Sequence, residues 1–132
     1  MIATFLDAGV IIAAGSGPAR QQYAALELMT DPEREFWTSP FVEMEVLPHA
    51  ERQGKPEAVD LYRSFFKSAR VYNNLDKIVK IAAGELRKTN LGLADALHLA
   101  AAHLAGVDQF ITTEKISKPM HRNKLVKVSV FR

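Results

Sequence analysis

Short apolar segments alternate with longer amphipathic segments along the chain. The short segments have the length and the branched or aromatic content of buried strands, and they cover residues 2–6, 36–38, 70–72, 110–112 and 126–130. In the last of these, Val126, Val128 and Val130 alternate with other residues, so we expect one face of that strand to contact solvent. Strands separated by helical segments are typical of βαβ units around a parallel sheet.

Capping and helix-breaking residues mark the predicted helices. Ser39 followed by Pro40 predicts a helix start, and Pro48 is expected to interrupt or kink that helix about two turns later. A helix over residues 18–29 is expected to place Tyr23 and Leu26 on one apolar face. Further helices are predicted from near Pro56, after the cap Asn73-Asn74, and over residues 93–104, the last apolar enough to be largely enclosed.

Composition is that of an ordinary soluble protein that forms one domain over residues 1–132. The chain is 48% hydrophobic and 24% charged, which does not indicate disorder. It has no cysteine, so disulfide frameworks and thiolate zinc sites are excluded, and its four histidines form no i, i+4 pair. Because we find neither a signal peptide pattern nor an apolar run of about 18 residues, we expect a cytoplasmic protein that does not interact with membranes.

The net charge of +2 is unevenly distributed. Residues 1–60 hold four basic and ten acidic residues, whereas residues 61–132 hold thirteen basic and five acidic ones. After Glu114 the chain has no further acid and six bases: Lys115, Lys118, Arg122, Lys124, Lys127 and Arg132. This tail suits a phosphate-rich partner, and a solvated basic surface is the alternative.

Four acids stand where the apolar pattern is broken or ends: Asp7, Glu45, Asp95 and Glu114. Asp7 and Glu114 follow predicted strands, and Asp95 lies in the first turn of a predicted helix. In a parallel sheet, the loops and helix starts at the carboxyl ends of the strands meet along one edge. We therefore expect these acids to converge. Their mutual repulsion would raise their pKa values unless a divalent cation, bound by oxygen atoms, neutralised it.

Three of these assignments have specific alternatives. Glu43 and Glu45 point about 200° apart on a helix, and Glu45 is preferred because it shares a stripe with Phe41, Met44 and Pro48. Asp7 could instead act as a capping or loop residue, and Glu114 could be a surface residue beside Lys115. We expect His98, one turn after Asp95, to be a hydrogen-bonded core residue in preference to a proton shuttle.

The acids lie within four segments, FLDAGVII at 5–12, SPFVEMEV at 39–46, LADALHLA at 93–100 and FITTE at 110–114. In this order and spacing, the segments resemble those of PIN-domain nucleases. The length of the chain is similar to that of VapC-type ribonuclease toxins of toxin–antitoxin pairs. Stand-alone PIN proteins with housekeeping roles in RNA processing have the same size.

The resemblance implies a three-layer α/β/α sandwich with a mainly parallel central sheet. It also implies hydrolysis of single-stranded RNA at a Mg²⁺ or Mn²⁺ site held by Asp7, Glu45, Asp95 and Glu114, with Thr112 fixing a water or phosphate. In this interpretation Lys115, Lys118 and Arg122 bind flanking phosphates. An antitoxin protein and a second copy of the chain are the expected protein partners.

Three positions depart from the family pattern. Gly9 stands where relatives often have a small polar residue, Glu114 replaces the commoner Asp, and Ile116 stands where many relatives carry a further acid. The sequence therefore favours one tightly held metal over two. It also leaves open a non-catalytic module that binds RNA or docks to a protein.

Overall fold

The computed structural model describes residues 1–131, and Arg132 of the basic tail lies outside them. The strands are β1 (Ile2–Leu6), β2 (Arg34–Thr38), β3 (Arg70–Val71), β4 (Gln109–Thr112) and β5 (Val128–Val130). The helices are α1 (Ala8–Ser16), α2 (Ala19–Met29), α3 (Pro40–Gln53), α4 (Pro56–Ser68), α5 (Leu75–Lys88), α6 (Leu93–Ala105) and the short 3-10 helix η1 (Pro119–Arg122). Each predicted strand is present, with ends that differ by up to two residues.

The five strands form one sheet in the order β3-β2-β1-β4-β5, and every neighbouring pair is parallel. On the central strand, Phe5 pairs with Trp37 of β2 and with Phe110 of β4. The rings of Phe5 and Phe110 stack with their centroids 5.4 Å apart. Because β1 and β4 are parallel neighbours, the residues that follow them emerge side by side at the carboxyl edge of the sheet.

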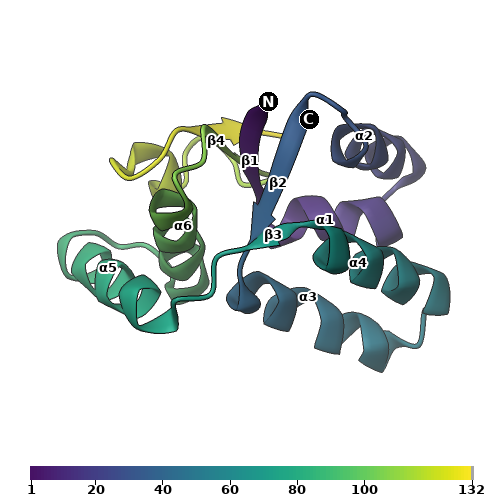
Figure 1. The fold of residues 1–132 in the computed structure, drawn as a ribbon, viewed down its shortest axis with the longest axis horizontal. Coiled ribbons are helices and arrows are strands. Elements are labelled where there is room, and N and C mark those ends of the chain that lie inside the picture. The colour runs from purple at the N-terminus through teal and green to yellow at the C-terminus, as the bar shows by residue number, and fades with distance from the viewer. Residues whose placement is uncertain (132) are drawn as a thin grey trace.

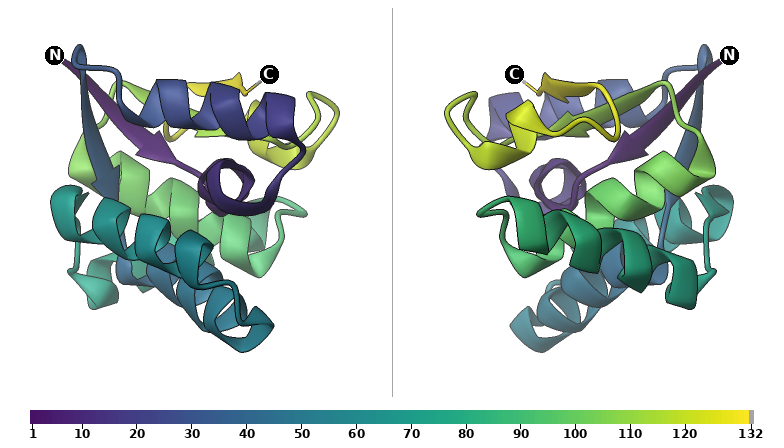
Figure 2. Two further views of the ribbon diagram at one scale, coloured as in Figure 1. Left: turned by 90° about the vertical axis from the view of Figure 1, so that its right-hand side faces the viewer. Right: turned by 90° about the vertical axis from the view of Figure 1, so that its left-hand side faces the viewer.

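Helices cover both faces of this sheet (Figure 1). Helices α5 and α6 pack together on one face, whereas α1, α2 and α4 lie on the other. The two side views in Figure 2 show α2 and α4 in front from one direction and α5 and α6 in front from the other. The expected α/β/α sandwich is confirmed, with a sheet that is parallel throughout.

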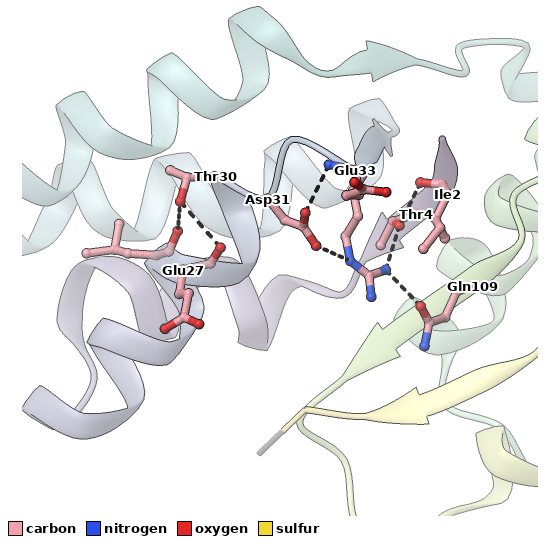
Figure 3. A network of polar contacts seen from close by, with 9 residues as sticks. Ile2, Thr4, Glu27, Thr30, Asp31, Glu33 and Gln109 are labelled. Carbon is pink, nitrogen blue, oxygen red and sulfur yellow. Dashed lines mark hydrogen bonds and ion pairs between the residues drawn. The ribbon is translucent and has the colours of Figure 1, made fainter.

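The amino end of the sheet is tied together by the guanidinium group of Arg34. Its Nη1 atom donates hydrogen bonds to Thr4 Oγ1 at 2.9 Å and to Gln109 Oε1 at 2.8 Å, which joins β2 to β1 and β4. Its Nε atom lies 3.3 Å from Asp31 Oδ2 in the turn before β2 (Figure 3). These contacts fix the order of the three central strands at the edge opposite the candidate site.

The structure confirms several predicted helix ends. The side chain of Ser39 caps α3, with Pro40 as its first residue, and Asn74 caps α5 by accepting a hydrogen bond from the backbone N–H of Lys77. Gly106 ends α6 with φ 72°, in the left-handed region that favours glycine. Within residues 1–131, no helix combines the length and apolar content needed to cross a membrane.

Other sequence expectations are wrong. Pro48 lies inside α3, which continues to Gln53, so it does not interrupt the helix. Tyr23 is 72% exposed because α2 buries Ala25 instead. In β5, Val128, Ser129 and Val130 are all half-buried, so the strand does not alternate between buried and exposed residues. Helix α1 was not predicted at all.

Candidate functional site

The four candidate acids lie on elements that meet at the carboxyl edge of the sheet. Asp7 directly follows β1, and Glu114 follows β4, the neighbouring strand. Asp95 is in the first turn of α6, and Glu45 is in the second turn of α3. The parallel order of the strands therefore gathers residues that are up to 107 positions apart in the chain.

Asp7 is buried, and both of its carboxylate oxygens accept hydrogen bonds. Oδ1 accepts from the backbone N–H of Ala8, which makes Asp7 the N-cap of α1. Oδ2 accepts from the Thr112 hydroxyl at 2.6 Å, a short bond typical of a charged acceptor. Asp7 thus has the capping role that was considered as an alternative, and it also lies at the candidate site. The Thr112 hydroxyl is fully buried and positions Asp7 from the end of β4.

Glu45 is paired with a buried histidine of α6. His98 is 1% exposed, and its Nε2 atom donates to Glu45 Oε1 at 2.8 Å. This hydrogen bond lowers the pKa of Glu45 below its ordinary value, although burial acts in the opposite direction. His98 is thus a hydrogen-bonded core residue, but its partner is a site acid. Its Nδ1 atom is buried and has no hydrogen-bond partner among the described residues.

The charges of the other three acids act on Asp95. Burial raises the pKa of Asp95 most, and the nearby carboxylates of Asp7 and Glu114 raise it further. Glu45 adds a smaller effect in the same direction, while the charge of His98 opposes it. Asp95 therefore lies close enough to the other three carboxylates to be repelled by them.

Glu114 begins a loop that carries the candidate phosphate-binding residues. Its backbone N–H donates to Thr112 Oγ1 at 3.1 Å, and its carbonyl oxygen accepts from His121 Nε2 at 2.9 Å. These bonds anchor the loop at both ends. The side chains of Lys115, Lys118 and Arg122 are exposed along it.

A hard divalent cation suits this donor set. The site offers carboxylate oxygens, the ligands that Mg²⁺ and Mn²⁺ prefer, and it carries more negative than positive charge. Among residues 1–131, no three Asp, Glu or His side chains already stand in a ready metal-binding arrangement. Since Glu45 is bonded to His98 and Asp7 to Thr112, binding one ion to all four acids would require their carboxylates to rearrange.

The sequence favours Glu45 over Glu43 because of a stripe of α3 that the structure does not bury. The buried face of α3 is formed by Val42, Val46 and Ala50, whereas Met44 and Pro48 are exposed. Glu45 reaches the site from the edge of that face, beside α6. The contact with His98 was missed, because no local pattern links residues 53 positions apart.

Two surface hollows differ in whether a candidate acid lines them. A small apolar groove of about 220 Å³ between α3 and α6 includes Glu45 and His98 in its wall. A larger hollow of about 820 Å³ lies near α2, Arg34 and β5, and none of the four acids lines it. The chemistry of the acids identifies the candidate site, since the size of a hollow says nothing about its reactivity.

The structure is therefore a parallel α/β sandwich in which acids gather at the carboxyl ends of the strands. The chain belongs to the PIN domain family, whose model matches residues 4–118. The resemblance seen in the sequence is thereby confirmed. A comparison of the sequence with curated proteins gave no significant match.

Several solved structures share this fold. VapBC2 from Rickettsia felis, bound to a DNA fragment from its promoter, aligns at 16% identity and a TM-score of 0.73, covering 99% of this chain and 100% of that one. A toxin–antitoxin complex from Klebsiella pneumoniae aligns at 22% identity and 0.66, covering 93% and 94%. VapC20 from Mycobacterium tuberculosis, a toxin that cleaves the sarcin-ricin loop, aligns at 17% identity and 0.66, covering 81% and 86%. At these identities the likeness establishes the fold.

Proposed function

We propose that this protein is a metal-dependent ribonuclease that hydrolyses phosphodiester bonds of single-stranded RNA, and that it is the toxin of a toxin–antitoxin pair. The observation that carries the proposal is the convergence of Asp7, Glu45, Asp95 and Glu114 at the carboxyl edge of the sheet, where burial and the other three carboxylates raise the pKa of Asp95. Such an excess of negative charge is costly unless a cation offsets it. Membership of the PIN family supports the same chemistry.

In this proposal Asp7, Glu45, Asp95 and Glu114 hold Mg²⁺ or Mn²⁺, directly or through water. A divalent ion held there would activate a water molecule and stabilise charge on the phosphoryl group. Thr112 holds Asp7 in place through its 2.6 Å hydrogen bond, so its burial favours a positioning role over contact with substrate. His98 similarly fixes the carboxylate of Glu45.

The exposed basic residues after Glu114 are the proposed binding site for the RNA backbone. We assign Lys115, Lys118 and Arg122 to phosphates that flank the bond to be cut, because they lie on the loop that leaves the site. Contacts of this kind bind the backbone without reading the bases. RNA binding is therefore expected to weaken steeply as the salt concentration rises.

The experiment compares the wild type with Asp95→Asn and Asp76→Asn on labelled single-stranded and double-stranded RNA. Asp76 is the matched control, since it is an exposed acid in the first turn of α5. We expect single-stranded RNA to be cut with Mg²⁺ or Mn²⁺, and cutting to stop with EDTA or with Asp95→Asn. Asp76→Asn should cut normally. Cutting that survives both EDTA and Asp95→Asn would show that these acids do not carry the activity.

A protein partner is proposed from the solved relatives, several of which are toxin–antitoxin complexes. Expression of the wild type alone should arrest growth, and expression with a small neighbouring reading frame should restore it. The Asp95→Asn variant should be harmless without that partner. Unimpaired growth with an active wild type would favour a housekeeping role in RNA processing.

We also propose a homodimer, to be tested by light scattering of the purified protein.

A further inference from the structure

The hydroxyl of Thr113 occupies the space in which a side chain on Gly9 would lie. A Cβ atom added to Gly9 would be only 2.4 Å from Thr113 Oγ1, whereas the Thr113 Cβ and Cγ2 atoms would each be 3.6 Å away. The glycines with positive φ in residues 1–131 are Gly54 and Gly106. The backbone of Gly9 therefore does not itself call for glycine, and the close approach of the Thr113 hydroxyl does.

This contact lies between two of the acids. Gly9 is the second residue of α1, two positions after Asp7, and Thr113 stands between Thr112 and Glu114. Thr112 is buried and bonded to Asp7, but the Thr113 side chain is exposed. No hydrogen bond joins the Thr113 hydroxyl to another described residue, so it is available to a molecule that binds at the rim of the site.

A neutral hydroxyl has a specific use beside carboxylates. Carboxylates repel the phosphates of RNA, whereas a threonine hydroxyl can donate a hydrogen bond to a phosphate oxygen without adding net charge. Gly9 and Ile116, two of the positions that depart from the family pattern, have no polar side chain. Thr113 therefore provides a donor on a rim where Gly9 provides none.

We propose that Thr113 is a substrate-positioning residue whose hydroxyl donates a hydrogen bond to a phosphate oxygen of the bound RNA, and that Gly9 is required to make room for it. The inference deepens the proposed function and rests on it. It predicts that moving the hydroxyl from position 113 to position 9 preserves its effect, because both positions point into the same space.

The test measures binding of a labelled single-stranded RNA by fluorescence anisotropy in the presence of Mg²⁺, with Asp95→Asn as the parent so that the RNA is not cut. Thr113→Val and Gly9→Ala, each added to the parent, should raise Kd by about 3- to 10-fold, as expected for the loss of one hydrogen bond at an exposed position. Thr113→Ser and the double change Gly9→Ser with Thr113→Ala should bind like the parent. Thr89→Val, an exposed threonine at the end of α5, is the control and should not alter Kd.

The outcomes separate the two proposals. If the parent binds RNA and Thr113→Val binds equally well, the role of Thr113 is refuted while the proposed function stands. If the double change binds no better than Thr113→Ala alone, the exchange between the two positions is refuted. A parent that binds no RNA, together with a wild type that cuts none, would overturn the proposed function and this inference with it. Thermal unfolding of every variant checks that a change in Kd is not a loss of fold.

Discussion

Two buried threonines make a matched pair for testing how the site is held together. Thr112 and Thr38 are the last residues of β4 and β2, and they are 0% and 1% exposed. The Thr112 hydroxyl donates to Asp7 Oδ2 and accepts from the Glu114 N–H, whereas Thr38 Oγ1 has no hydrogen-bond partner among residues 1–131. Replacing either residue with valine keeps its shape and its branching, so the two changes differ in the bonds that are lost.

The two substitutions are expected to change the free energy of unfolding differently. Thr112→Val removes a bond to a charged group, worth about 1.5–3 kcal/mol, and weakens a second bond to a backbone N–H that water can partly replace. We expect a loss of about 2–3 kcal/mol in the free energy of unfolding. Thr38→Val removes an unsatisfied buried hydroxyl and should be neutral or stabilising by up to about 1 kcal/mol.

Thermal unfolding by calorimetry or circular dichroism measures both changes. With an unfolding entropy of about 2.1 cal/mol/K per residue, a chain of this length shifts its Tm by about 4 °C per kcal/mol. Thr112→Val should therefore lower Tm by about 7–11 °C, while Thr38→Val should leave it unchanged or raise it by up to about 4 °C. Equal shifts for the two variants would refute the reasoning, because they would show that the bond to Asp7 contributes nothing.

Two further predictions concern charge and space. Burial and neighbouring carboxylates raise the pKa of Asp95, so ionising it costs stability as the pH rises through its raised pKa, and that cost persists at higher pH. Asp95→Asn should therefore raise the Tm of the metal-free protein at pH 7 but not at pH 3. It should also abolish the rise in Tm that Mn²⁺ gives the wild type. Scanning fluorimetry with EDTA or Mn²⁺ measures both effects. In α1, a Cβ on Gly15 would lie 2.4 Å from the Tyr62 hydroxyl oxygen, so Gly15→Ala should destabilise by about 1–3 kcal/mol. Gly84→Ala in α5, where nothing lies within 4 Å, should stabilise by about 0.5–1 kcal/mol, and urea unfolding that ranks the two changes equally would contradict the packing argument.

The strands and most helices were predictable because they are local patterns. Residues 2–6 form a strand-like run of four apolar residues and one threonine, and Ser39 with Pro40 marks a helix start by side-chain chemistry alone. Helix α1 escaped prediction because it is buried on nearly all sides. Without a polar face it shows no helical period, and Gly9 and Gly15 further weaken the helical signal.

The candidate acids could also be selected from the sequence, since a charge that ends or interrupts an apolar segment stands out. The side chains and backbone positions that they contact could not. Glu45 meets His98, Asp7 meets Thr112 and Gly9 meets Thr113 across at least 53 positions. Such contacts depend on the order of the strands and on the packing of α3 against α6, which no local pattern contains.

Asp7 both starts α1 and accepts a bond from β4, so its removal would loosen the framework as well as the chemistry. Asp95 has no such structural role among the described residues. If the protein is toxic, cells that escape it should acquire two kinds of lesion. Changes at Asp95 would leave an abundant but silent protein, while changes at Asp7 would leave little protein at all, and immunoblots of the survivors would distinguish them.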